Sequence, residues 1–476
     1  MIDVKNFLKQ TFNTDVIENK ANQLTWLSWY KNTNNWRNYY VTLANEKRSK
    51  KQYTRHSLFS CKRVCEDWAN LLLNEKTDIV VSNSDNTLNQ ALHDVLNYND
   101  FWTLGNKAIE KVFALGAGSF VTSMDTNGKI TIEFVDGTRC YVLNCNADDV
   151  VDCAFENTTY IKGKKYTILT VHKKNEDNDE YIIYNYLFDE DGGIQSEETM
   201  QQLLQVPSQT PSKIKTFAFV TPQNLAKNNW DTPFADSIFS KAVDANKMID
   251  LAFDSYCNEF ILGKKRIFVA SELVSYARET TKDGKSSTTT IPIFDENEVV
   301  FNLLNQQENG ETLIKEIDMK LRVSEHQQGI QDALNFFASL CGLGEKYYKY
   351  DQGNIATATQ IVSENSVLFR NIQKQQIQIE KCLKEVCNAI FGLLGVEIGE
   401  STEVTIQFDD SIIEDKDTER KRDLLDVDKG IMSKAEYRSK WYGETIEEAQ
   451  KIIDKIEGTE TEKELKKNAD NEKFLI

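Results

Sequence analysis

The sequence lacks the long apolar segments and the leader pattern of membrane and exported proteins. No apolar run reaches about 18 residues, the length at which a transmembrane helix becomes a candidate. The first residues, MIDVKNFLKQTFNTDV, do not show the basic segment followed by an apolar one that marks a signal peptide. We therefore expect a protein that has no membrane segment and is made and retained in a cytoplasm.

Patterns of metal-binding and disulfide-forming residues are also missing. The chain has nine cysteines at scattered positions and no Cys-x-x-Cys pair, which disfavours a disulfide framework. Cys61 and Cys65 lie one helical turn apart, as buried small residues often do. The four histidines, which never form a ligand-spaced pair, are His56, His93, His172 and His326. The spacing indicates no structural zinc site, and we expect no cofactor.

The sequence also has no excess of basic residues. Aspartate and glutamate number 74 against 56 lysines and arginines, so the formal net charge is −18. Such a balance argues against a protein that grips nucleic acid through a broad basic face. It remains compatible with a protein that surrounds DNA, because an acidic wall repels phosphate and lets a polyanion slide past. At 476 residues the chain is long enough for two or three domains.

The N-terminal region, residues 1–75, reads as helical and carries a cluster of aromatic residues. Core or subunit packing is the preferred interpretation of this cluster, and stacking on bases is the alternative. Its members are Trp26, Trp29, Tyr30, Trp36, Tyr39 and Tyr40. A helical period continues through residues 57–74.

A second helical region, residues 87–115, is followed by Gly116-Ala117-Gly118 and then by a strand at 119–124. A Gly-x-Gly can form a phosphate-binding loop, but a dinucleotide site requires a strand, then glycines, then a helix. The order is reversed in this chain. The glycines therefore indicate a helix C-cap that leads into a strand.

Residues 119–220 are rich in β-type sequence. The segments 129–135, 165–171 and 180–186 show alternation or β-branched enrichment, and acidic turns separate them. One turn, residues 189–193 (DEDGG), contains enough carboxylates to suggest calcium. Because it lacks the alternating ligand spacing and the distal glutamate of an EF-hand loop, a solvated turn is the better interpretation.

The central part of the chain predicts a long helix with a β insert at its end. Residues 236–262 carry one apolar stripe with steps of three or four and would span about 40 Å as a helix. The stripe consists of Ile238, Ala242, Ala245, Ile249, Ala252, Tyr256 and Phe260. The acidic residues Asp236, Asp244, Asp250, Asp254 and Glu259 lie largely off it. Beyond Gly263, strands are expected at 264–269, 288–294 and 298–303.

The chain then returns through a second helix. Alternating apolar residues at 317–323 predict an extended approach, and Ser324 with Gln327 fits a capping box that begins a helix ending before Gly342 and Gly344. A loop with three tyrosines follows. From Ala356 to Leu394 there is no proline, so one helix of about 58 Å is expected.

The C-terminal part begins with a strand at 403–408 and continues with charged helices over 415–456 and a charged tail from Thr459. The acidic residues Asp409, Asp410, Glu414, Asp415 and Asp417 suggest a metal-dependent nuclease as an alternative. A nuclease, however, gathers its carboxylates from several elements around bound metal. A single acidic run beside a strand is usually solvated.

Several segments, in this order along the chain, resemble the portal protein family, the head-to-tail connectors of tailed bacteriophages, in the type found in phages of low-GC Gram-positive bacteria. The first are 74–75 with 115–118, the segment EFILGKKRIFV at 259–269, and 321–323. The others are 342–343, TATQIVSEN at 357–365, FDDSIIEDK at 408–416, GIMSK at 430–434 and GETIEEA at 443–449.

The resemblance implies an α+β portal fold assembled as a ring of twelve copies. It implies a wing at 1–235 with a mainly helical N-terminus and a β-rich part, a stem helix at 236–262 and a clip at 263–316. A return stem helix would occupy 317–343, a tunnel loop 344–355, a long wing helix and strand 356–412, and a helical crown with a mobile tail 413–476.

The resemblance also implies a function without catalysis. The ring would sit at one capsid vertex of the virion, after assembly in the host cytoplasm, and double-stranded DNA would enter and leave through its channel. The implied partners are the terminase large subunit, major capsid and scaffold proteins, and a head-completion adaptor that leads to the tail. The alternatives are a metal-dependent nuclease of a mobile element and a capsid scaffold protein that forms no ring.

Two groups of residues are assigned to this machinery. The tunnel-loop residues, expected to face DNA in the channel, are Glu345, Lys346, Tyr347, Tyr348, Lys349 and Tyr350. The residues at the junction of stem and clip are Lys264, Lys265 and Arg266. Lys346 and Lys349 offer transient phosphate contacts, and the tyrosines have packing between neighbouring loops as their alternative role.

Overall fold

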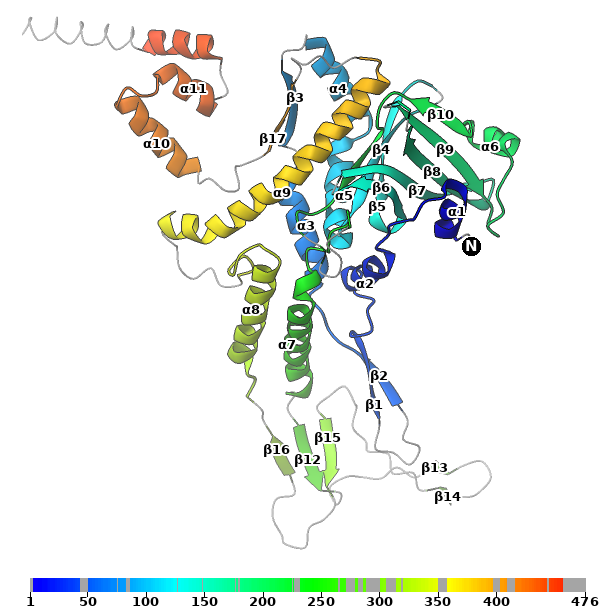
Figure 1. Cartoon of the computed structure of the whole chain (residues 1–476). Coiled ribbons are helices and arrows are strands. Elements are labelled where there is room, and N and C mark those ends of the chain that lie inside the picture. Colours follow the sequence, from blue (N-terminus) through cyan, green and yellow to red (C-terminus); the bar gives the residue numbers. More distant parts are fainter. Residues whose placement is uncertain are drawn as a thin grey trace, which may run out of the picture. The chain divides into compact units, whose positions relative to one another are not determined.

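The structure, a computed structural model, describes residues 3–42, 50–74, 76–82, 86–125, 127–147, 149–175, 177–178, 180–224, 226, 232–263, 266–270, 279–280, 286–287, 300–304, 314–317, 320–349, 358–396, 403–408, 416–442 and 445–456. They form two compact units, the first from 1–352 and 370–407 and the second from 353–369 and 408–476. The predicted α+β class is confirmed, with helices and sheets in the first unit (Figure 1).

The β-rich part is an antiparallel sheet of five strands in the order β10-β9-β8-β7-β6. Its strands are β6 (Cys140–Asn146), β7 (Asp149–Ile161), β8 (Lys164–Lys174), β9 (Tyr181–Phe188) and β10 (Gln209–Ser212). Helix α1 (Val4–Phe12) covers one face, where Leu8 and Phe188 belong to one buried cluster. Helix α6 (Glu197–Leu204) lies between β9 and β10 in sequence. Strands predicted at 165–171 and 180–186 are thus confirmed.

A smaller sheet, β11-β4-β5, lies against the other face of the five-stranded sheet. It contains β4 (Gly118–Met124), β5 (Ile130–Asp136) and β11 (Phe217–Val220), and a short 3-10 turn, Gly137–Arg139, leads from β5 into β6. Ala117, Val142 and Phe217 are buried in one cluster between the two sheets. The core of this region is therefore formed by apolar side chains from both sheets.

Helices α3 (Ser60–Leu72), α4 (Asn86–Tyr98) and α5 (Phe101–Leu115) pack beside these sheets. The predicted helical region 87–115 is broken because Asp100, at φ 46°, interrupts it between α4 and α5. Gly116 adopts φ 75° at the end of α5, which confirms the predicted C-cap. A Cβ atom at this position would lie 2.1 Å from the carbonyl oxygen of Ala235, so only glycine fits there.

The prediction that residues 1–75 are helical is wrong between α2 (Lys20–Tyr30) and α3. A hairpin of two strands, β1 (Asn38–Thr42) and β2 (Lys50–Thr54), occupies this stretch. Tyr39 and Tyr53 face each other across the hairpin with stacked rings 5.6 Å apart. Cross-strand aromatic pairs of this kind favour strands over helix, and the helical period masked them.

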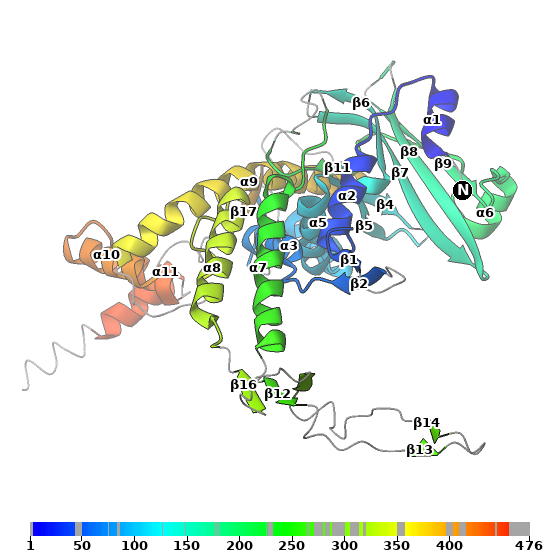
Figure 2. The same cartoon turned by 90° about the horizontal axis from the view of Figure 1, so that it is seen from below.

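Helices α7 (Val243–Leu262) and α8 (Val323–Leu340) pack side by side (Figures 1 and 2). The first helix begins later than predicted: Asn224 bonds the backbone of Asp236, Phe113 accepts bonds from Ser237 and Ile238, and a 3-10 turn at Ser240–Ala242 precedes α7. The predicted capping box is also wrong. Arg322 is the N-cap of α8, and its side chain makes no capping bond.

The insert between α7 and α8 contains strands, as predicted. The sheet β15-β12-β16 consists of β12 (Arg266–Ala270), β15 (Val300–Leu304) and β16 (Ile314–Ile317), and a second pair joins β13 (Glu279–Thr280) to β14 (Ser286–Ser287). The strand expected at 288–294 lies outside the described residues. The extended approach was predicted at 317–323, but β16 ends at Ile317 and α8 already begins at Val323; residues 318–319 lie outside the described residues.

Helix α9 (Ala358–Leu393) has 36 residues and confirms the predicted long helix. After it, β17 (Glu403–Gln407) pairs antiparallel with β3 (Asp78–Ser82), with Ile406 opposite Ile79. The sequence predicted β17 but gave no indication of its partner.

The second unit contains α10 (Lys416–Asp428), α11 (Lys434–Tyr442) and helical residues 446–456. Ala435, Ala449 and Ile453 form its buried cluster. Asp423 accepts bonds from Lys440 Nζ at 2.7 Å and Trp441 Nε1 at 3.0 Å, which joins α10 to α11. The charged tail predicted from Thr459 lies outside the described residues.

Candidate functional site: the helical hairpin and the loop after it

The end of the α7–α8 hairpin is closed by a charged fork. Glu259, on the last turn of α7, receives bonds from Arg322 Nε at 3.1 Å and from Arg322 NH2 at 2.8 Å. His326 Nε2 lies 3.5 Å from the same carboxylate. These Arg322 bonds are the main reason why the pKa of Glu259 is lowered to about 2. The fork therefore stays charged at every physiological pH and holds the two helices together beside the β insert.

A row of polar side chains on α7 is buried, although these residues lie off the predicted apolar stripe. Asn246, Asp250 and Asp254 are spaced by four and are each at most 8% exposed. Asp254 Oδ1 accepts from the backbone N–H of His56 and contacts its Nδ1, both at 2.9 Å. The row thus faces the chain segment that precedes α3, and its carboxylates serve as attachment points for that segment.

Asp250 has the most perturbed carboxyl group in this row. Burial raises its pKa to about 6, while a bond from Ser57 and the charges of Arg37 and Arg55 act in the opposite direction. On its own helix, Asp250 Oδ2 accepts a hydrogen bond from Asn246 Nδ2 at 3.4 Å. Asp250 is therefore a buried titratable group on the face of α7 that is turned toward the base of the β1–β2 hairpin.

The loop after α8 is fastened to α3 through Tyr348. The Tyr348 hydroxyl donates to Asp67 Oδ2 at 2.7 Å, and its carbonyl accepts from Gln331 Nε2 at 2.7 Å. Burial and the Asp67 charge raise the pKa of Tyr348 far above its usual range. Tyr347 packs edge-on against Tyr348 at 5.1 Å, and burial raises its pKa to about 12. Both tyrosines are half-buried in their own chain.

The other residues that the sequence assigned to the loop and to the stem–clip junction are either exposed or have side chains that the structure does not describe. Glu345, Lys346 and Lys349 are exposed. Arg266 begins β12, and its side chain is not described. Tyr350, Lys264 and Lys265 lie outside the described residues.

Trp68 links the same loop to the core of the first unit. Its Nε1 donates to the carbonyl of Cys341 at 3.1 Å, and its ring stacks on Phe113 at 5.6 Å. Asn371, on α9, donates to the carbonyl of Gly342 at 2.7 Å. The start of the loop is thus held by α3, α5 and α9, none of which the sequence connected to it.

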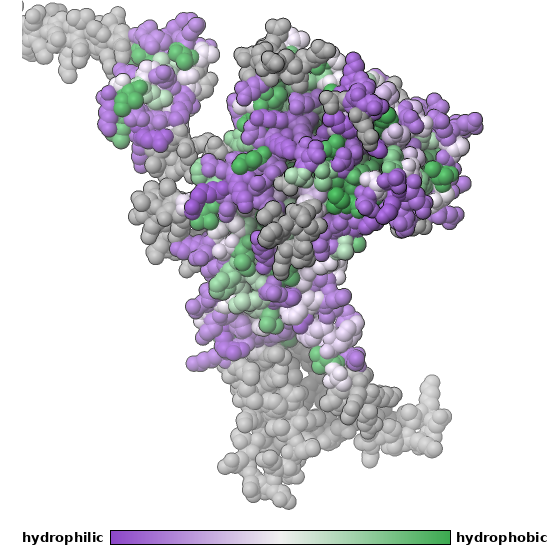
Figure 3. Space-filling model, viewed as in Figure 1, coloured by the Kyte–Doolittle hydropathy of each residue, from purple (hydrophilic) through white to green (hydrophobic). Residues whose placement is uncertain are grey.

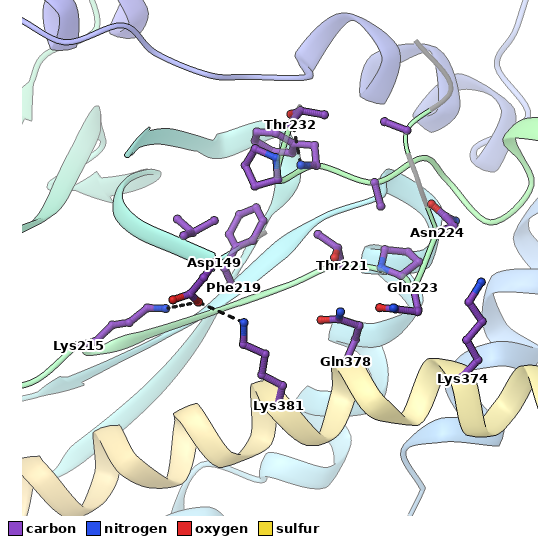
Figure 4. A pocket seen from close by; sticks show the side chains of 16 residues that line it. Asp149, Lys215, Phe219, Thr221, Gln223, Asn224, Thr232, Lys374, Gln378 and Lys381 are labelled. Carbon is purple, nitrogen blue, oxygen red and sulfur yellow. Dashed lines mark hydrogen bonds and ion pairs between the residues drawn. The ribbon is translucent and has the colours of Figure 1, made fainter. Parts of the chain in front are cut away.

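A pocket of about 150 Å³ lies where α9 meets the segment after β11 (Figure 4). Lys215 and Lys381 converge on Asp149, with Nζ–Oδ1 distances of 3.9 and 3.2 Å. Lys215 also contacts Glu385 at 3.2 Å. Lys374 also lines the pocket, so its charged lining consists of one acid and three lysines, and the ion pairs connect α9 to the sheet region.

Sequence reasoning missed the contacts that hold this site together. Glu259 and Arg322 both stand in segments that resemble the portal family, but their pairing crosses the whole β insert. Nothing in the sequence indicated that His56 would meet Asp254. Among the described residues no helix is long and apolar enough to cross a membrane, and no cluster of three acidic, histidine or cysteine residues is arranged for a metal. Of the acidic run, Asp409, Asp410, Glu414 and Asp415 lie outside them, and Asp417 belongs to α10, with its side chain not described.

Comparison with known proteins gives one match over nearly the whole length. A model of the family described as phage portal protein, SPP1 Gp6-like, matches residues 11–462. No curated protein matches the chain in sequence.

Solved structures show a distant likeness. A chain from the neck of an empty GTA particle computed with C6 symmetry gives a TM-score of 0.47 at 10% identity, covering 91% of this chain and 97% of that one. A chain from the virion of a native gene transfer agent (GTA) particle gives 0.42 at 10% identity, with the same coverage. Both scores are below 0.5, and the family assignment rests on the sequence match alone.

Proposed function

The chain belongs to the phage portal protein family of the SPP1 Gp6-like type, and from this membership we propose that it forms a ring of twelve copies at one capsid vertex. Double-stranded DNA is packaged and ejected through the channel of this ring. The observation that carries the proposal is a family match that extends over residues 11–462 of 476. The ring also serves as the docking site for the terminase large subunit, the capsid and scaffold proteins, and the head-completion adaptor.

In this proposal α7 and α8 are the stem, and the β insert between them is the clip. The fork of Glu259 and Arg322 supports this assignment because it fixes the two helices at the end from which the insert leaves. Lys264, Lys265 and Arg266 follow directly and form the junction to the clip.

The loop from Gly344 is the tunnel loop. Tyr348 is bonded to Asp67 of α3, while Lys346 and Lys349 are exposed on either side of Tyr347 and Tyr348. We propose that these two lysines make transient phosphate contacts, with Tyr347 and Tyr348 as the fixed base of the loop. Twelve copies at −18 give −216 formal charges, so the ring as a whole repels DNA and keeps it mobile.

Native mass spectrometry and negative-stain imaging of the purified full chain test the ring. We expect closed rings, and a monomer or dimer under all conditions contradicts the proposal. The nuclease alternative predicts divalent-metal-dependent cleavage of DNA by the same preparation, and a scaffold protein predicts assemblies that are not closed.

The loop assignment has its own test. Lys346→Ala with Lys349→Ala should leave rings intact and alter DNA packaging in particles that carry the variant. Unchanged packaging removes these lysines from the DNA path, whereas loss of the rings assigns them to assembly.

A further inference from the structure

The β1–β2 hairpin is an exposed ribbon between α2 and α3. Each of its strands has one unpaired edge, because the sheet contains only these two strands. All of its described residues are exposed except Tyr39, which is half-buried. Figures 1 and 2 both show it extending beyond α2. Isolated two-stranded hairpins are marginally stable in water, so a ribbon of this kind usually has support at its base or a partner along its length.

The base of the hairpin is firmly supported. Arg55 donates its backbone N–H to the carbonyl of Arg37 at 2.8 Å. Its guanidinium carbon lies 4.0 Å from the ring centre of Trp36 and 4.4 Å from that of Tyr39. The next residue, His56, is fixed on Asp254 of α7. These contacts set the direction in which the ribbon leaves the molecule.

The ribbon carries positive charge in an acidic protein. Lys50 and Lys51, both exposed, lie on β2, and the described residues from Asn38 to Arg55 include no acid. In the sequence, residues 38–55 contain five lysines and arginines and one glutamate, a net charge of +4. The other 458 residues therefore carry −22.

The exposed apolar groups of the ribbon suit a protein surface better than DNA. Tyr40 is 64% and Val41 41% exposed. The faces of Tyr39 and Tyr53 already stack on each other, and Lys51 Nζ lies 5.2 Å from the Tyr53 ring centre. Duplex DNA offers phosphates to a surface like this, but apart from thymine methyl groups it has few partners for apolar side chains, and it does not extend an open strand edge.

We propose that the β1–β2 hairpin docks on a second copy of this chain, where its lysines meet aspartate or glutamate side chains. The inference rests on the proposed ring, in which every copy repeats the same contact with the next one. The net charge of −22 outside the hairpin favours contact of the positive ribbon with another copy, and the supported base lowers the entropic cost of ordering the ribbon.

Zero-length carbodiimide coupling of assembled full-length protein tests the contact directly. Copies labelled with heavy and normal nitrogen are mixed before assembly, so that coupled peptides from two different copies have a distinct mass. We expect Lys50 or Lys51 joined to an aspartate or glutamate of the other copy. Rings that yield only couplings within one copy at these lysines overturn the docking, while the ring itself stands.

Charge reversal gives the second test. Lys50→Glu with Lys51→Glu should raise the protein concentration needed for half-assembly by about tenfold, equal to about 1.4 kcal/mol. The matched control, Lys162→Glu with Lys164→Glu, makes the same charge change at the exposed turn between β7 and β8. Equal weakening by both pairs means that total charge governs assembly and overturns the local contact.

The same charge-reversed variant tests whether the hairpin binds DNA instead of a second copy of the chain. Retention of linear duplex DNA by the assembled variant should equal that of the unchanged protein. A variant that assembles normally but loses DNA assigns the hairpin to DNA and overturns the proposal. Unchanged protein that forms no ring under any condition contradicts the proposed function first, and the docking with it.

Discussion

The aromatic cluster around His172 in the five-stranded sheet and the α7–α8 hairpin bury titratable groups in opposite ways. In the sheet, His172 lies between the rings of Phe155 and Phe217, and burial lowers its pKa to about 3, so it is neutral. Its Nδ1 lies 3.1 Å from the Thr216 hydroxyl. The helical hairpin instead buries Asp250 and Asp254. The cluster around His172 is therefore held by contacts that do not change with pH above its pKa, whereas the hairpin, like Asp152 on β7, buries carboxyl groups that need partners at defined positions.

Apolar contacts carry the larger share of stability in the sheet. Phe188 is 1% exposed and packs edge-on against Phe7 at 5.1 Å. Phe188→Ala should reduce the free energy of unfolding of the first unit by about 3–5 kcal/mol. Urea denaturation measures the change, and it should be the same with and without about 1 M salt because no charge is involved. A loss that depends on salt breaks the contrast between the two regions.

The loop after the helical hairpin should respond to a single hydroxyl group. Tyr348→Phe removes the bond to Asp67, a charged acceptor, and should cost about 1.5–2 kcal/mol in the same denaturation assay. The control is Tyr347→Phe, which keeps the ring contact between the two tyrosines and should change stability by less than about 0.5 kcal/mol. Equal effects of the two substitutions place the stabilisation in ring packing rather than in the bond.

The raised pKa of Asp250 determines the direction and the pH range in which the stability of the protein should change. Its folded pKa of about 6 is above the ordinary value of 3.8, so ionising it opposes folding. Its stabilising contribution is complete below about pH 4 and is lost as the pH rises through 6. Asp250→Asn should therefore stabilise the protein by about 1–2 kcal/mol near pH 8.

This gain should shrink toward zero near pH 4, and thermal unfolding of both proteins across the pH range measures it. His172→Gln provides the reference in the sheet, where the effect of substitution should not vary between about pH 5 and 8 because His172 is already neutral. A constant gain from Asp250→Asn contradicts a titrating carboxyl at this position.

Breaking the fork of Glu259 and Arg322 should have the most local effect on the protein. Arg322→Ala leaves Glu259 without its two strongest bonds and should speed hydrogen exchange at the end of α7 and the start of α8, with little change in the sheet. The pKa of Glu259 is lowered, so its contribution is present above its ordinary value near 4.5 and is lost as the pH falls toward 2. Lys247→Ala, which removes an exposed pair with Asp244, is the control for a surface ion pair. Exchange that rises equally in the sheet contradicts a local role.

The sequence predicted elements whose signals are local. The long helix α9, the strands β8 and β9, and the C-cap at Gly116 each follow from a period or a residue type within one segment. The late start of α7 was missed because Asn224 and Phe113, far away in sequence, bond the residues before it. The hairpin β1–β2 was missed because its cross-strand pairs did not outweigh an apparent helical period.

The sequence predicted where along the chain the site residues lie, but not which residues they contact. The sequence identified the tyrosine loop, but Asp67, which anchors Tyr348, stands 281 positions earlier. Asp250 and Asp254 were expected off the apolar stripe, and they are, yet they are buried because another segment covers that face. A hydrophobic period identifies which residues avoid water, and it carries no information on polar residues that are buried by a distant part of the chain.

The pairing of β3 with β17 has a consequence for synthesis. The ribosome completes β3 early, but its partner strand emerges only after residues 83–402 have been made. Until then the edge of β3 is open, and open edges invite association with other chains. A polypeptide truncated before Glu403 never closes this edge, and it leaves the first unit incomplete. Closure by β17 thus makes synthesis as far as Gln407 a precondition for a properly folded first unit, which disfavours entry of shorter fragments into a multi-copy assembly. On the face shown in Figure 3, green hydrophobic residues interrupt a mainly purple, hydrophilic surface over α8. A molecule with such a surface should meet other copies only after this last strand is in place.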